Sequence, residues 1–104
     1  MTDKEIIRVA KGFTKGLLGK KSTVDMCYVV CSPLVGYLSM LGVDCRLTDG
    51  YIDHCEAELH HFWITLSDGK IIDPTADQFG LLNSWVVNQP SNYKVKQTLL
   101  GTGA

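Results

Sequence analysis

The chain has 104 residues, of which 45% are hydrophobic and 20% charged, enough to bury one core but too few for two domains of ordinary size. Its formal net charge of −1 argues against a protein that holds nucleic acid through overall charge. No apolar run is long enough for a signal peptide or a membrane span. We therefore expect one cytoplasmic domain over residues 1–104, with no nucleic-acid or membrane partner and with reduced cysteines.

The first expected element is a helix from Asp3 to about Leu18. Apolar residues recur along it at steps of three and four, and Thr2 or Asp3 can serve as its N-cap. Residues 1–21 carry six basic side chains against two acidic ones, a net charge of +4. Because only one side of the segment is basic, we interpret it as a solvent-exposed helix face and not as a membrane-binding surface.

A second helix is expected to end at Leu41, where Gly42 terminates it. Two starts fit the sequence. Asp25 can cap a helix that begins at the next residue, in which case Pro33 lies inside the helix and costs a hydrogen bond. Alternatively, Ser32 is the cap and Pro33 takes the first helical position, which suits proline.

Beyond this helix the chain alternates apolar segments with polar turns. We expect strands at residues 43–48 (continuing to 52 past a bend), 61–67 (entered through Glu58 or Leu59), 70–73 and 93–99, a polar loop at 53–58, and a strand or helix at 81–87. Together these elements predict an α+β fold, in which N-terminal helices pack on a small antiparallel sheet of three to five strands.

The hairpin around Asp68-Gly69 begins with the imidazole of His61 and ends with the carboxylate of Asp73. If Asp68 and Gly69 fill a two-residue turn, Asp73 lies opposite Ile64. That position is three residues, or about 10 Å, along the strand from His61. A twist or a bulge in so short a ribbon would bring the two side chains together.

A cysteine becomes a nucleophile when a helix N-terminus and a neighbouring imidazole stabilise its thiolate. Cys27 lies near the start of the second helix, and His61 and Asp73 follow it along the chain. This order suits acyl transfer, in which Cys27 attacks, His61 moves the proton and Asp73 orients the imidazole.

These residues resemble the transglutaminase-like branch of the papain-like cysteine protease superfamily. The resemblance covers residues 27–75: a cysteine that opens a helix, His61-Phe62-Trp63 at a strand start, and Ile72-Asp73-Pro74-Thr75 at the end of a hairpin. It implies a papain-like core with the nucleophile at the N-terminus of the core helix. It also implies hydrolysis or transfer of an acyl group from a peptide, amide or thioester, without a cofactor.

Three further residues are expected at the substrate site. Trp63 would form one wall of it, His54 would lie on a loop near the cleft, and Cys31 stands one helical turn after Cys27. Cys31 is also a rival nucleophile, because Cys31-Ser32-Pro33 resembles the helix opening of the cell-wall amidase branch of the same superfamily. That branch lacks the Asp-Pro-Thr ending.

A non-catalytic interaction module is the competing interpretation. No glutamine precedes Cys27 to help bind an oxyanion, and the carboxylate of Asp25 beside the nucleophile disfavours a thiolate.

A metal site is not expected. His54, Cys55, His60 and His61 lie within eight residues, but their spacing does not match a zinc motif, and His60 and His61 point to opposite faces of a strand.

Overall fold

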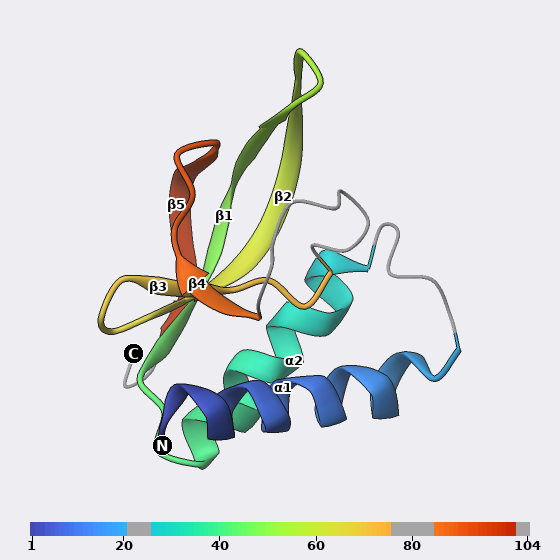
Figure 1. The fold of residues 1–104 in the computed structure, drawn as a ribbon, viewed down its shortest axis with the longest axis vertical. Helices are drawn as coiled ribbons and strands as arrows, with labels where there is room; N and C mark the ends of the chain where they lie inside the picture. The colour runs from blue at the N-terminus through green and yellow to red at the C-terminus, as the bar shows by residue number, and fades with distance from the viewer. Residues whose placement is uncertain (21–25, 76–84, 102–104) are drawn as a thin grey trace.

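The computed structural model describes residues 1–20, 26–75 and 85–101, with the backbone alone at 99–101. Its elements are the helices α1 (Asp3–Leu18) and α2 (Cys27–Met40) and the strands β1 (Cys45–His54), β2 (Ala57–Leu66), β3 (Lys70–Ile72), β4 (Val86–Asn88) and β5 (Tyr93–Gly101). The strands form one antiparallel sheet in the order β4-β3-β2-β1-β5. In Figure 1, α2 lies beside β1 and β2, and α1 crosses below the sheet. The expected α+β class, with two helices on a small antiparallel sheet, is confirmed.

Helix α1 begins and ends where its sequence predicts. The Thr2 hydroxyl accepts the amide hydrogen of Glu5, and the Glu5 carboxylate accepts the amide hydrogen of Thr2, a reciprocal N-cap. The chain leaves the helix at Gly19, whose φ of +60° suits glycine. Ile6 and Ala10 enter the main core, while the described basic residues of the segment are exposed.

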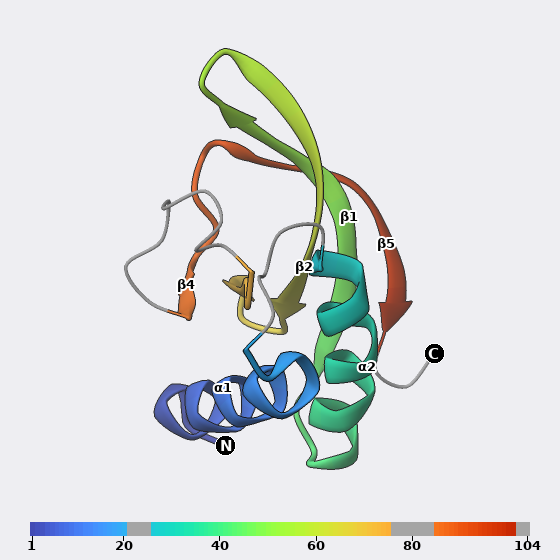
Figure 2. The same ribbon diagram turned by 90° about the vertical axis from the view of Figure 1, so that its right-hand side faces the viewer.

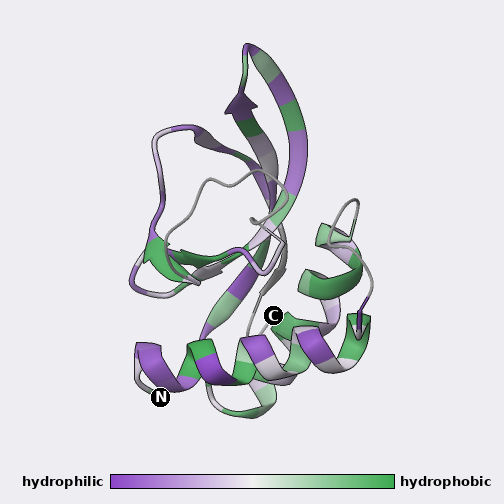
Figure 3. Ribbon diagram, turned by 45° about the vertical axis from the view of Figure 1, so that its right-hand side comes forward, coloured by the Kyte–Doolittle hydropathy of each residue, from purple (hydrophilic) through white to green (hydrophobic). Residues whose placement is uncertain are grey.

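Helix α2 begins at Cys27 and contains Pro33 in its interior, so the start at Ser32 is wrong. Met26 is the N-cap and makes no side-chain hydrogen bond to the helix; Asp25, the expected cap, lies outside the described residues. The helix is apolar on nearly every side (Figure 3), and its buried side packs against β1 and β2.

Two hydrophobic clusters lie on the two faces of the sheet. The larger lies between the helices and the sheet and consists of Ile6, Ala10, Cys31, Leu34, Val35, Leu38, Val43, Cys45, Leu47, Ile64, Leu66 and Ile72. The smaller lies on the other face and consists of Ile52, Trp63, Ile71 and Tyr93, with Val87 packed against it.

The sheet is curled around the smaller cluster. β4 and β5 are its opposite edges, yet only residues 89–92 connect them. A flat sheet of five strands is about 19 Å wide. The connection is not extended, because the Tyr93 amide donates to the Pro90 carbonyl at 3.0 Å. The two edges are therefore closer than in a flat sheet. In Figure 2 the connecting segment passes across the upper part of the view from β4 to β5.

The turn between β2 and β3 is one residue longer than expected. Ile64 pairs with Ile72, so the turn consists of residues 67–69 rather than two residues. Gly69 has a φ of +89°, and such a left-handed glycine is typical of three-residue hairpin turns.

This turn length changes the place of Asp73. In the observed register Asp73 comes opposite Trp63 and not Ile64. Cross-strand neighbours share a face of the sheet, and a shift of one residue exchanges the faces. Asp73 thus lies on the same face as His61, two residues away from it along β2, without the twist or bulge that the expected register required.

Residues 53–58 are not the expected loop. β1 and β2 remain paired as far as His54 and Ala57, which leaves a two-residue turn of Cys55 (φ +51°) and Glu56 (φ +62°). Such turns usually contain Asn or Gly, so the sequence carried no turn signal here. β5 confirms the expected last strand, while residues 81–84 of the expected strand or helix lie outside the described part of the chain.

Candidate active site

Cys27 is the first residue of α2, and its thiol is half-buried. The first turn of a helix has amide hydrogens without partners and the positive end of the helix dipole. Hydrogen bonds from the backbone of Phe62, on β2, and of Tyr28 reach the sulfur. The helix start and the neighbouring strand thus both offer donors to a thiolate at this position.

Strand β2 brings His61 to the same place. The Cys27 thiol and the His61 ring are hydrogen-bonded to each other, and His61 is only 1% exposed. Burial disfavours the thiolate, but the bond to His61, the backbone bonds and the charge of His61 outweigh it, and the pKa of Cys27 is lowered. Cys27 therefore has the character of an activated thiol.

Asp73 continues this line of contacts. His61 Nε2 lies 2.8 Å from Asp73 Oδ2, and both side chains are buried. Because the carboxylate occupies Nε2, Nδ1 is the ring nitrogen left for the thiol. Burial on its own lowers the pKa of His61, but the contacts with Asp73 and Cys27 raise it to about 9. The imidazolium is therefore the stable form at neutral pH.

The Asp73 carboxylate is saturated with donors. Oδ1 accepts the amide and the hydroxyl of Thr75, at 3.2 and 3.3 Å. Oδ2 accepts from His61 and from the Tyr93 hydroxyl, the latter at 2.6 Å. A buried carboxylate needs such partners to remain ionised. Thr75 and Tyr93 were both missed as site residues: Thr75 appeared only as part of a motif, and no local pattern marks Tyr93.

Cys31 and Trp63 lie beneath this site. Neither can contact a substrate, so the expectation that they line the substrate site is wrong. Both are fully buried, and the Cys31 thiol donates to the Phe62 carbonyl at 3.7 Å. Burial, with the nearby charges of Asp73 and Cys27, raises the pKa of Cys31 well above its ordinary value. The structure therefore favours Cys27 over Cys31 as the nucleophile.

His54 is not near the site. It pairs with Ala57 at the end of the β1–β2 hairpin, four residues or about 13 Å along β2 from His61, and the hairpin extends away from both helices (Figure 1). Its ring lies 3.4 Å from the Cys55 sulfur. The expectation of a loop residue beside the cleft is therefore wrong.

The three histidines have three different partners, because His60 pairs with Asp49, His61 with Asp73 and His54 with Cys55. In the described part of the chain, no three His, Cys, Asp or Glu side chains gather as a metal site.

A row of aromatic rings beside Cys27 was also missed. Ring centroids are 5.0 Å apart between Tyr28 and Phe62, 4.9 Å between Phe62 and His60, and 5.8 Å between His60 and Tyr51. Tyr28 is 50% exposed, and the other three rings are at least partly exposed. Alternation along β2 places Phe62 and His60 on one face, but only the docking of α2 adds Tyr28. The row offers an aromatic surface that runs along the hairpin from the residue after the nucleophile.

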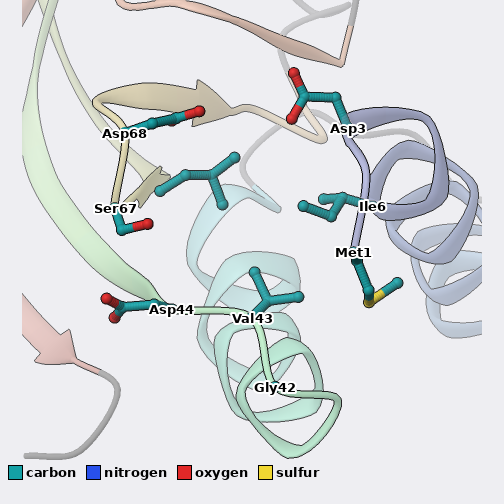
Figure 4. Close-up of a pocket in the computed structure, with 9 residues that line it drawn as sticks. Met1, Asp3, Ile6, Gly42, Val43, Asp44, Ser67 and Asp68 are labelled. Carbon is teal, nitrogen blue, oxygen red and sulfur yellow. The ribbon is translucent and has the colours of Figure 1, made fainter.

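A separate pocket of about 260 Å³ lies at the other end of α2. Figure 4 shows that the start of α1, residues 42–44 and the β2–β3 turn line it. Cys27 stands at the opposite end of the 14-residue helix, about 21 Å away. Lys70 bonds to Asp3 and Asp68, two of the lining residues. This pocket does not belong to the Cys27 site.

Comparisons with known proteins give no match. No family model matches the chain, and neither the curated proteins nor the solved structures contain a significant relative. The described helices also include none that is long and apolar enough to cross a membrane.

Proposed function

We propose that this chain is a thiol hydrolase or acyltransferase with a transglutaminase-like core, in which Cys27, His61 and Asp73 form a catalytic triad. The observation that supports it is the continuous line of hydrogen bonds from the Cys27 thiol through the His61 ring to the buried Asp73 carboxylate. A lowered thiol pKa beside a raised imidazole pKa is the pattern of an activated nucleophile.

The reaction follows from these roles. The Cys27 thiolate attacks the substrate carbonyl carbon, and the electron pair of the double bond moves to oxygen. Amides in the first turn of α2, where the N-cap Met26 makes no side-chain hydrogen bond to the helix, supply hydrogen bonds to that oxyanion. The His61 imidazolium then protonates the leaving group, and a Cys27 thioester forms. Water or an amine, deprotonated by His61, releases the acyl group and restores the thiolate.

The substrate class follows from the surface beside Cys27. The rings of Tyr28 and Phe62 lie 5.0 Å apart, and backbone groups of both residues reach the Cys27 sulfur. This aromatic pair suits an apolar group close to the scissile bond of a peptide, amide or thioester. We propose a small or terminal acyl group, or one specific protein partner, as the substrate.

A non-catalytic interaction module is the second candidate, and one surface favours it. Val29 and Met40 are exposed along one side of α2, by 49% and 85%. Exposed apolar surface of this kind often marks a protein-binding site.

The test of the proposed activity is the reactivity of each cysteine. Iodoacetamide labelling of the native protein over a pH series, followed by mass spectrometry, gives a separate rate for each thiol. At pH 6 we expect Cys27 to react faster than exposed Cys55, since its pKa is lowered. Cys31 should stay unlabelled, since it is buried. Labelling of Cys31 before Cys27 would overturn the assignment of the nucleophile, and a Cys27 that reacts no faster than Cys55 would favour the interaction module.

The alkaline end of the pH profile of turnover tests the role of His61 as the acid. Its pKa of about 9 keeps the imidazolium present from neutral pH up to about pH 9. Protonation of the leaving group requires this form, so hydrolysis of an activated amide such as a p-nitroanilide should fall above about pH 9. A turnover rate that keeps rising through pH 10 would contradict the role of His61 as the acid.

A further inference from the structure

Tyr93, at the start of β5, reaches the site from the far edge of the sheet. Its hydroxyl donates to Asp73 Oδ2 at 2.6 Å, the same oxygen that lies 2.8 Å from His61 Nε2. Tyr93 is only 2% exposed. Burial and the neighbouring Asp73 carboxylate raise its pKa, so the phenol keeps its proton and stays a donor at any pH at which the protein would work.

We propose that Tyr93 is a positioning residue of the triad, which holds Asp73 Oδ2 toward His61 and keeps this buried carboxylate ionised. The inference rests on the proposed function, because it assigns Tyr93 a part in activating Cys27.

The Tyr93 side chain is held firmly in this position. The backbone amide of Tyr93 donates to the Pro90 carbonyl at 3.0 Å, and the side-chain amide of Gln89 donates to the backbone carbonyl of Tyr93 at 2.9 Å. Its ring packs edge-on against Trp63, with 5.0 Å between the centroids. The ring alone provides this packing. The hydroxyl adds no apolar contact and is directed at the carboxylate, so its effect on the site is separable from the effect of the ring on stability.

The curl of the sheet explains how Tyr93 reaches Asp73. Asp73 follows β3 and Tyr93 opens β5, and two strands stand between β3 and β5 in the sheet. The short segment 89–92 joins the two edges, and both Tyr93 and Ile71 of β3 belong to the smaller cluster. β5 therefore completes the hydrogen bonding of a group that the resemblance placed entirely within residues 27–75.

Loss of the hydroxyl should act in one direction. Asp73 Oδ2 would keep His61 as its partner but lose its other donor, which disfavours the ionised form of a fully buried carboxylate. The His61 imidazolium then loses part of its counter-charge and becomes less stable. The Cys27 thiolate, which the imidazolium stabilises, becomes less stable as well. The thiolate should therefore form at higher pH.

The experiment compares the pH profiles of Cys27 alkylation in wild type and in Tyr93→Phe, with the fold monitored by circular dichroism. We expect the acid-side limb of the profile to move to higher pH by about half a unit or more, since hydrogen bonds to charged groups are strong. Tyr37→Phe, an exposed tyrosine on α2, is the matched control and should leave the limb in place. An unchanged limb in Tyr93→Phe, or one moved to lower pH, would overturn the proposal.

Two additions keep the outcome decisive. The first is His61→Ala in the same series, which separates failure of the proposed function from failure of the role of Tyr93. If Cys27 of the wild type has no acid-shifted limb, the proposed function is refuted. A limb that His61→Ala removes and Tyr93→Phe leaves intact refutes only the role of Tyr93. If Tyr93→Phe does not fold, 3-fluorotyrosine at this position keeps the ring and strengthens the donor. The limb should then move to lower pH, and an unchanged limb rejects the inference.

Discussion

Replacing Asp73 by Asn should lower Cys27-dependent turnover by roughly 10²–10⁴-fold, the usual contribution of general acid–base catalysis, while the protein stays folded. The amide oxygen of Asn can still accept from Thr75, so the turn persists. The neutral side chain cannot balance the charge of the His61 imidazolium, so the Cys27 thiolate loses its stabilisation. The acid-side limb of Cys27 alkylation should accordingly move to higher pH, which the labelling experiment measures without a known substrate.

Asp53→Asn is the matched control for this substitution. Asp53 lies on β1 and pairs at the surface with Lys94, at 3.7 Å, so its loss should leave the profile unchanged. If Asp73→Asn also leaves the profile unchanged while His61→Ala removes its acid-side limb, the site is a Cys-His dyad and Asp73 only forms the turn. No effect from either substitution would support the non-catalytic module.

Gly50→Ala should destabilise the fold by about 3 kcal/mol or more, at or beyond the upper end of the usual cost of overpacking. A Cβ at this position would lie 2.3 Å from the backbone oxygen of Lys94 on β5 and 2.3 Å from Trp63 Cη2. Neither can move away easily, because β5 is paired with β1 here and the Trp63 side chain is fully buried. Equilibrium unfolding in urea measures the change in the free energy of unfolding.

Gly36→Ala provides the comparison for Gly50→Ala. Gly36 lies on the exposed side of α2, and a Cβ there would meet no atom within 4 Å. Alanine should therefore stabilise the helix by up to about 1 kcal/mol. A Gly50→Ala variant as stable as wild type would contradict the close packing of β1, β5 and Trp63. It would also contradict the position of β5 from which Tyr93 reaches Asp73.

Local signals in the sequence were sufficient for the outline of the fold. The spacing of apolar residues and the Thr2 cap predicted α1 with its observed bounds. The alternation in residues 61–67 predicted the strand that carries His61, although β2 begins earlier, at Ala57. The same signals singled out Cys27, His61 and Asp73, which the structure brings into contact. They succeeded because helix capping and strand alternation depend on residues close together in the chain.

Tertiary contacts decided the rest. The length of the β2–β3 turn determines which face of the sheet carries Asp73, and one residue is enough to reverse it. Burial and the contact with His61 distinguish Cys27 from Cys31, since both cysteines lie near the start of the same helix. Tyr93 joins the site because the sheet curls and the short segment 89–92 carries the chain from β4 across to β5. Periodicity and motifs in the sequence report on neighbouring residues, whereas register, burial and curl depend on contacts between residues far apart in the chain.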